Sequence, residues 1–427
     1  METEKNQKRI VIYGGGTITH VTPHLALSAP AYGTTAKFLA EKATKILPKM
    51  TTELVLKKMA GGIIEANHEL ASHITKQLDD HRTKIIIMSA AICDFDGHFP
   101  GKQCGKYGER LKSDSVNYLT LIPSEKIISK IRKNRKDIFL VGFKATSGLS
   151  EDEQYIEGLN LCKQASCNLV FANDVTTRKQ MIITPEEARY GTNLSRGDAL
   201  IELLEICYHR THLTFTKSTV VSGTPIPWIS EEIPESLKTV VNYCISKNAY
   251  KPFNGATAGH FACKVNDNTF LTSIRKTNFN DIEKLGLVKV VTDGPDSVIA
   301  YGAKPSVGGQ SQRIVFSEHN NLDCIVHFHC PIKEGSSVPR ISQREFECGS
   351  HECGQRTSRN LKTFGNLKAV YLENHGPNIV FNRRINPEEV IKFIENNFDL
   401  SQKTGGFCHL REKVSTSNTL ETAINIM

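Results

Sequence analysis

From residue 9 to about residue 207, short runs of β-branched residues alternate with longer amphipathic stretches. This alternation is typical of a mostly parallel sheet whose strands are connected by crossover helices. Helical periodicity is clearest at residues 34–45 and 152–164, which are rich in good helix formers. We therefore predict an α/β domain with strands at Ile10–Tyr13, Thr52–Leu56, Lys84–Ser89, Phe139–Phe143 and Leu169–Ala172.

A second α/β pattern follows in the C-terminal half of the chain. The order breaks between residues 208 and 233, where turn-forming residues gather. At 427 residues the chain is also too long for one ordinary hydrophobic core. We therefore predict two domains, residues 1–207 and 234–427, with a linker at 208–233. The elements predicted for the second domain are a helix at 234–247 and strands at 261–265, 289–291 and 324–328.

The composition is that of a globular protein. Hydrophobic residues make up 39% of the chain and charged residues 23%, which excludes a disordered protein. Basic residues exceed acidic ones by 53 minus 45, or +8, but they are spread along the whole chain and form no nucleic-acid-binding block. We expect small-molecule substrates, with a modest preference for anions, and neither nucleic acid nor a membrane as a partner.

Targeting and cysteine patterns both favour the cytoplasm. The N-terminus leads into a buried strand without an apolar targeting core, and no window approaches the roughly 18 apolar residues of a membrane span. The 12 cysteines are dispersed, and the closest pairs, Cys162 with Cys167 and Cys348 with Cys353, lack the two-residue spacing of a zinc knuckle. Reduced thiols are therefore expected.

Three histidines at the ends of apolar strands suggest a metal site. The apolar segment 324–331 contains His327 and His329, which share a face because side chains alternate along a strand. His375 follows a second apolar strand and precedes a glycine that permits a tight turn. Three neutral nitrogens with an open fourth position suit catalytic zinc, which acts as a Lewis acid. The alternative, histidines hydrogen-bonded inside a core, has about equal weight on the residues alone.

A glycine run in the first domain suggests a phosphate site. The buried strand at residues 10–13 leads directly into Gly14, Gly15 and Gly16. Bare backbone there could approach a phosphate closely and present N–H donors. A tight turn that needs a positive φ explains the same glycines equally well. The run matches neither the dinucleotide-binding fingerprint nor the lysine-bearing P-loop.

The stretch from about residue 234 to residue 398 resembles the class II aldolase and adducin family. Gly255–Val265 is similar to the family's entry strand, and Lys304–Ser306 to its lysine-proline-serine turn. His327-Phe328-His329 resembles the paired metal ligands, and Asn374-His375-Gly376 the third. The resemblance implies a three-layer α/β/α domain that binds zinc or another divalent metal for aldol cleavage, dehydration or epimerisation. The substrate contacts that it implies are Gly259, His260, Thr272 and Ser306.

One departure concerns the acid or base of this second domain. The family's proton-exchanging glutamate is replaced by Gly308, and glycine takes no proton. Glu373, His351 and Glu352 are the candidates to replace it as catalytic residues. His351 and Glu352 also open a predicted helix, where capping and dipole stabilisation are the alternative role.

The segment from about residue 8 to residue 207 resembles phosphopantothenoylcysteine synthetase, a ligase of coenzyme A biosynthesis. The similar motifs are Ser89–Phe95, Arg110–Lys112, Val141–Thr146 and Ala172–Val175. The resemblance implies a Rossmann-like, mostly parallel domain that binds CTP or ATP with Mg²⁺, and it places the catalytic Lys112 near the triphosphate. The nucleotide-binding residues that it implies are Gly15, Gly16, Ala90, Ala91, Asp94, Phe143 and Asn173.

Two departures affect the ligase reaction. Ala26 stands where the family has a substrate-holding asparagine, and Lys144 where it has a glutamate. Retention of nucleotide binding is therefore favoured over retention of coenzyme A synthesis.

We interpret the chain as a bifunctional metabolic enzyme. In this interpretation a metal-dependent lyase, acting on a phosphorylated or anionic sugar-like substrate, is fused to a nucleotide-binding, ligase-like domain. The alternatives are a non-catalytic binding or scaffold protein with degenerate sites and a coenzyme A pathway ligase with a passenger second domain. Both resembled families form symmetric oligomers, so a homo-oligomer is expected by analogy.

Overall fold

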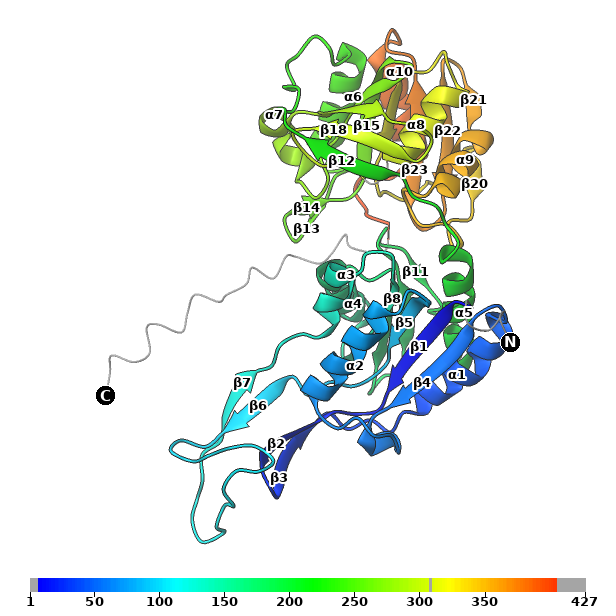
Figure 1. Ribbon diagram of the computed structural model, residues 1–427. Coiled ribbons are helices and arrows are strands. Elements are labelled where there is room, and N and C mark those ends of the chain that lie inside the picture. The colour runs from blue at the N-terminus through cyan, green and yellow to red at the C-terminus, as the bar shows by residue number, and fades with distance from the viewer. Residues whose placement is uncertain (1–6, 307–308, 405–427) are drawn as a thin grey trace, which may run out of the picture.

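The computed structural model describes residues 7–306 and 309–404. They form two α/β domains, drawn one above the other in Figure 1. We call residues 9–210 the first domain and residues 217–404 the second domain. The α/β class predicted for each half is confirmed.

The first domain is built on a seven-stranded sheet. Five neighbouring strands, which reach one edge of the sheet, are parallel, and two antiparallel strands extend the sheet at the other edge. Ile10 and Ile12 face one helical layer, whereas Val11 and Tyr13 face the other, and this explains why the strand is apolar throughout. In sheet order the strands are β11 (Arg189–Tyr190), β10 (Gln180–Ile183), β9 (Leu169–Asp174), β8 (Phe139–Thr146), β5 (Thr83–Met88), β1 (Arg9–Gly14) and β4 (Thr51–Leu56).

Helices cover both faces of this sheet. Leu39 and Leu203 pack in the cluster on one face, and Leu70 and Leu159 in the cluster on the other. The helices of the first face are α1 (Thr34–Ile46) and α5 (Arg196–Arg210), and those of the second are α2 (Asn67–Asp79), α3 (Ile128–Asn134) and α4 (Glu151–Ala165), with the 3₁₀ turn η1 (Lys58–Ala60) after β4. Both helices predicted from periodicity are therefore present.

Two hairpins leave the carboxyl-terminal edge of the parallel strands. Figure 1 shows them extending away from the second domain. The loop at 99–119, which contains Lys112, connects the strands of the second hairpin. The hairpins are β2 (Ile18–Thr22) with β3 (Leu25–Ser28), and β6 (Phe95–His98) with β7 (Thr120–Pro123).

The second domain contains a ten-stranded sheet that is mainly antiparallel. Its first strand lies inside the predicted linker 208–233, so this segment contributes to the second sheet. In sheet order the strands are β12 (Lys217–Val221), β18 (Ser297–Tyr301), β17 (Val288–Thr292), β16 (Thr269–Thr272), β15 (His260–Asn266), β19 (Cys324–His327), β23 (Gly376–Phe381), β22 (Leu367–Leu372) and β20 (Arg340–Ile341), with β21 (Lys362–Phe364) paired to β22. A separate hairpin joins β13 (Pro252–Phe253) and β14 (Ala256–Thr257).

Helices on both faces complete the three layers predicted for this domain. Leu237, Val240 and Ile391 pack in the cluster on one face of the sheet, and Val315 and Phe316 in the cluster on the other. The helices of the first face are α6 (Glu235–Ser246), η2 (Phe279–Asp281), α7 (Ile282–Leu285) and α10 (Pro387–Asn397), and those of the second are α8 (Gly309–Glu318) and α9 (His351–Asn360).

A buried ion pair anchors the contact between the domains. The guanidinium of Arg210 lies 2.6 Å from a carboxylate oxygen of Glu186, and both side chains are almost fully shielded from solvent. Arg210 also donates to the carbonyls of Gln343 and Arg344 in the second domain. Arg344 in turn pairs with Glu202 of α5. The contact between the domains is therefore polar: the buried pair of Arg210 and Glu186 is accompanied by the partly exposed pair of Arg344 and Glu202.

Within residues 7–306 and 309–404, no helix combines the length and apolarity needed to cross a membrane. All cysteines in this part of the chain are free thiols.

A buried lysine in the first domain makes stability depend on pH. Lys57 is fully shielded, its ammonium has no hydrogen-bond partner among the described residues, and it lies 4.7 Å from the centre of the Tyr13 ring. Burial lowers the pKa of Lys57 to about 7. The unfolded chain, with a lysine pKa of roughly 10.4, then binds more protons than the folded chain between these two values. The contribution of Lys57 to stability is therefore least favourable below pH 7 and improves as the pH rises.

We expect Lys57→Met to raise the free energy of unfolding at pH 6 by about 2–4 kcal/mol, because methionine fills the site without a charge. The gain should shrink as the pH rises toward 10. Urea unfolding at pH 6, 7.5 and 9 measures it, with Lys49→Met, a change at an exposed lysine, as the control. A gain that is the same at all three pH values would contradict the assignment.

Candidate metal centre and nucleotide site

The structure brings the three predicted metal-binding histidines together. His327 ends β19, His329 follows two residues later, and His375 lies in the turn between β22 and β23. Because β19 lies between β15 and β23, the ends of adjacent strands meet at this point. One ligand nitrogen from each histidine lies within 4.8 Å of the other two, and no other group of metal-ligating side chains is found in the part of the chain that the structure describes.

The nitrogen geometry matches a single bound ion. Nδ1 of His327 donates to the carbonyl of Pro377 at 2.7 Å, which leaves its Nε2 unprotonated and free to ligate. That Nε2 lies 3.2 Å from Nε2 of His375. Two nitrogens bound to one tetrahedral zinc at its usual bond length lie about 3.3 Å apart. These two rings are therefore already spaced for a shared metal.

Burial keeps the imidazoles neutral. The three histidines expose 1%, 5% and 1% of their surfaces, in chain order. Burial, followed by the influence of neighbouring imidazoles, holds the pKa of His327 and of His375 well below its usual value, and burial also lowers the pKa of His329. Neutral imidazole is the form that binds metal, so no proton has to leave before ligation at neutral pH.

A tight backbone approach explains the glycine after the third histidine. Gly376 has a φ of 156°, and a Cβ atom added there would lie 2.1 Å from the carbonyl oxygen of Phe328. Only glycine therefore allows the turn that contains His375 to pack directly on the segment between His327 and His329.

The substrate residues implied by the resemblance lie near the histidines to different degrees. The ring of His260 lies 4.8 Å from that of His327, Gln312 donates a hydrogen bond to it, and burial lowers the pKa of His260 to about 3. A Cβ atom at Gly259 would lie 2.6 Å from the carbonyl oxygen of His327. Thr272 is fully buried, with its hydroxyl on the carbonyl of Phe261, and the amide of Ser306 donates to Ser273.

The candidate acids and bases do not join the histidine group. The ring of His351 contacts the hydroxyl of Thr216, and Glu352 accepts hydrogen bonds from the amide and hydroxyl of Thr214. Both side chains therefore hold the connecting segment against the start of α9. Glu373 is exposed in the turn before His375. Gly308 lies outside the described residues.

One residue next to the histidines was not predicted from the sequence. Glu187 belongs to the first domain, in the loop between β10 and β11, yet its Oε2 lies 3.6 Å from Nδ1 of His329. The same carboxylate pairs with Lys163 at 3.2 Å and with Lys403 at 2.8 Å. Burial alone would raise the pKa of the Glu187 carboxyl, but these two ammonium groups outweigh it and hold the pKa well below its usual value.

In the first domain, neighbouring backbone segments pack against the predicted glycines and hydrogen-bond to them. Gly15 and Gly16 run alongside Ala91, and the amide of Gly16 donates to the carbonyl of Ala31 at 2.9 Å. A Cβ atom at Gly16 would lie 1.9 Å from the carbonyl oxygen of Ala29. Close packing of the chain therefore requires this glycine, and its N–H is already satisfied.

The other predicted nucleotide residues lie in the parallel strands or in the segments that follow them. Ala90 follows β5, and Asn173 lies near the end of β9. Asp94 pairs with Lys126 at 2.6 Å, and the ring of Phe143 stacks on that of Phe171. Lys112 is exposed in the loop at 99–119. Ala90 and Asn173 lie at the carboxyl ends of parallel strands, whereas Glu187 lies in the loop after the antiparallel strand β10, toward the opposite ends of these strands.

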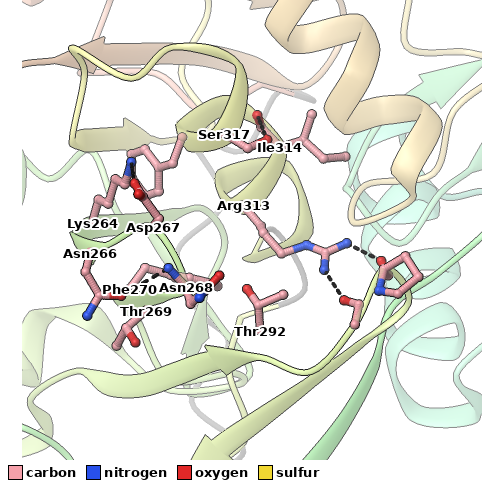
Figure 2. A pocket seen from close by; sticks show the side chains of 13 residues that line it. Lys264, Asn266, Asp267, Asn268, Thr269, Phe270, Thr292, Arg313, Ile314 and Ser317 are labelled. Atoms are coloured by element: carbon pink, nitrogen blue, oxygen red, sulfur yellow. Dashed lines mark hydrogen bonds and ion pairs between the residues drawn. The ribbon is translucent and has the colours of Figure 1, made fainter.

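A surface cavity of about 320 Å³ lies away from both sets of residues (Figure 2). The charged side chains that line it already form ion pairs or hydrogen bonds with neighbouring residues. Lys264 pairs with Asp267, and the guanidinium of Arg313 turns to the carbonyls of Gly294 and Pro295. Its lining includes none of the predicted site residues.

The fold and the histidine cluster define a two-domain α/β protein with a candidate metal centre in its second domain. Residues 5–190 match the DNA/pantothenate metabolism flavoprotein C-terminal domain, and residues 240–383 match the class II aldolase and adducin N-terminal domain. The chain is thus a fusion of these two kinds of domain.

Curated relatives are similar to part of the chain. The Coenzyme A biosynthesis bifunctional protein CoaBC of Thermococcus kodakarensis is 27% identical over 173 residues, which are 39% of this chain and 41% of that protein. The chain spans about two fifths of the length of the curated relatives it matches.

Two solved structures are similar at lower identity. The DNA/pantothenate metabolism flavoprotein of Streptococcus pneumoniae is 16% identical, with a TM-score of 0.38 over 46% of this chain and 97% of its own. An L-fuculose 1-phosphate aldolase is 15% identical, with a TM-score of 0.30 over 39% of this chain and 85% of its own.

Proposed function

We propose that the protein is a bifunctional small-molecule enzyme. The second domain is a metal-dependent lyase of the class II aldolase type, which cleaves or dehydrates a phosphorylated or anionic sugar-like substrate. The first domain binds CTP or ATP with Mg²⁺ and is of the phosphopantothenate-cysteine ligase type. The observation that carries the proposal is the 3.2 Å separation of the Nε2 atoms of His327 and His375 within a buried, neutral histidine group.

The residues of the second domain suit this chemistry. A divalent ion held there supplies a Lewis acid that polarises a substrate oxygen. His327, His329 and His375 offer neutral nitrogens, and the Pro377 carbonyl fixes the orientation and tautomer of His327. His260 narrows the space beside the ligands, and Gln312 holds its ring.

Metal content and turnover of the full chain test the lyase. We expect about one zinc per chain by elemental analysis, as a catalytic site with three histidines requires. Release of a carbonyl product from phosphorylated sugars should stop on chelation and return when zinc is added back. A folded, metal-free protein that takes up no added metal would overturn the proposal.

The first domain is proposed to bind nucleotide without completing the ligase reaction. The match to CoaBC supports the binding. Ala26 replaces the family's asparagine, and the ammonium of Lys144, which replaces its glutamate, pairs with Glu157 at 3.0 Å.

We therefore expect the full chain to bind CTP or ATP with Mg²⁺ in calorimetry, but to release no pyrophosphate when phosphopantothenate and cysteine are added. Pyrophosphate release would instead favour the coenzyme A pathway ligase with a passenger second domain. Absence of both nucleotide and metal binding would favour a scaffold protein, the alternative suggested by the replacements at Gly308, Ala26 and Lys144.

A further inference from the structure

The metal centre of the second domain includes a neighbour from the first domain. Glu187 lies in a turn after β10, 2% exposed, and its carboxylate faces Nδ1 of His329 at 3.6 Å. That Nδ1 atom is buried and has no hydrogen-bond partner among the described residues. A buried donor without a partner is costly, so an acceptor just beyond bonding distance is the natural one to satisfy it.

The turn that presents Glu187 is held in an unusual conformation. Glu187 has a φ of 72°, in the left-handed region that non-glycine residues rarely adopt. Its amide donates to Thr184, and its carbonyl accepts the hydroxyl of the fully buried Tyr155. The neighbouring Glu186 is fixed by Arg210, which also binds the second domain. The surroundings therefore hold the Glu187 carboxylate at the domain contact.

Two lysines keep this carboxylate charged. Lys163 comes from α4 of the first domain, and Lys403 from the end of the described chain. The amide of Thr404, directly after Lys403, donates to the carbonyl of His329. The carboxylate, its two counter-charges and the histidine therefore form one connected group with members from both domains.

We propose that Glu187 is a positioning residue of the metal centre: it accepts the Nδ1 hydrogen of His329, directs Nε2 of that ring to the ion, and makes metal affinity in the second domain depend on its contact with the first. This inference rests on the proposed metal site. A carboxylate behind a ligating histidine fixes its tautomer and orientation and makes it a better ligand. Closing the 3.6 Å gap to a normal hydrogen bond needs a ring movement of well under about 1 Å.

The test measures metal affinity in the full chain, not activity. Chelator-stripped wild type and Glu187→Gln are titrated with Zn²⁺ against a chromophoric chelator, and the visible spectrum of the Co²⁺ form reports ligand geometry. We expect about 10–100-fold weaker Zn²⁺ binding in Glu187→Gln, the usual cost of losing such a partner, and a shifted Co²⁺ spectrum. The matched control is Glu202→Gln, which removes a carboxylate paired with Arg344 across the same domain contact but away from the histidines.

The outcomes separate this inference from the proposed function. Equal affinity and spectra in wild type and Glu187→Gln would overturn the role of Glu187 and leave the metal site intact. Equal weakening in Glu202→Gln would also overturn it, because general loosening of the contact would then be the cause. A wild type that binds no metal would overturn the proposed function itself.

A second, charge-balanced variant tests whether misfolding causes the loss of affinity. Glu187→Gln leaves two lysines without their carboxylate, so Glu187→Gln with Lys403→Met removes an anion and a cation together. This double variant should show the same weakened Zn²⁺ affinity with a native circular dichroism spectrum. Wild-type affinity in the folded double variant would overturn the inference.

Discussion

Replacing His327 with asparagine is expected to leave the purified protein without bound metal. The asparagine amide is able to keep a hydrogen bond to the Pro377 carbonyl, but it removes the Nε2 that faces His375. Loss of a neighbouring hydrogen-bond partner alone usually costs 10–100-fold in metal affinity, so loss of a ligand should cost more than about 100-fold. The metal content in elemental analysis should fall from about one metal per chain to near none, and turnover by the proposed lyase should fall with it.

A histidine outside the group provides the control. His319 contacts Ser358 and Lys368 in the same domain, and it lies outside the three-histidine group. His319→Asn should therefore retain the wild-type metal content. The reference for folding is chelated wild type, because metal loss itself lowers stability by mass action. Undiminished metal in folded His327→Asn would contradict the centre described here.

Breaking the buried ion pair between Arg210 and Glu186 should cause the largest loss of stability. Arg210→Met leaves the Glu186 carboxylate in a fully shielded position without its cation, and it removes the donors to the carbonyls of Gln343 and Arg344. Losing one partner of such a pair typically costs 3–5 kcal/mol, because the remaining charge is buried and uncompensated. Urea unfolding of the full chain should show a loss of about this size.

Two further variants identify the cause of that loss. Arg344→Met breaks a partly exposed pair at the same contact and should cost about 1 kcal/mol or less. Combining Arg210→Met with Glu186→Gln removes both charges and should recover part of the stability. If the double variant is no more stable than Arg210→Met, the hydrogen bonds to the second domain carry the effect instead of the charge pair.

Much of the fold was predictable because buried strands are apolar over several consecutive residues. The strand at residues 10–13 contacts helical layers on both faces, so its pattern is strong. Strand β12 was missed because it is short, lies at the edge of the sheet and is largely exposed, so it carries no apolar run. The turn formers that follow it suggested a linker where the chain forms part of the second sheet.

The candidate site was predictable only within one domain. Strand alternation predicted that His327 and His329 share a face, and the resemblance to the aldolase family supported His375 as the third ligand. The pairing of β19 with β23 is what brings the third histidine to the other two. Glu187 was not predictable, since no local pattern indicates that a turn of one domain will contact the histidines of another. Likewise, nothing in the order of residues shows that His351 and Glu352 turn toward Thr214 and Thr216 instead of toward the histidines.

The position of β12 decides where the polypeptide may be divided. This strand follows directly on α5 and pairs in parallel with β18 along its whole length. A fragment that starts at residue 234 would lack β12 and leave one edge of β18 unpaired, although β17 still pairs with its other edge. An unprotected sheet edge of this kind promotes self-association. A fragment of the second domain therefore has a complete sheet only when it includes residues 217–221, which precede the family match at residues 240–383.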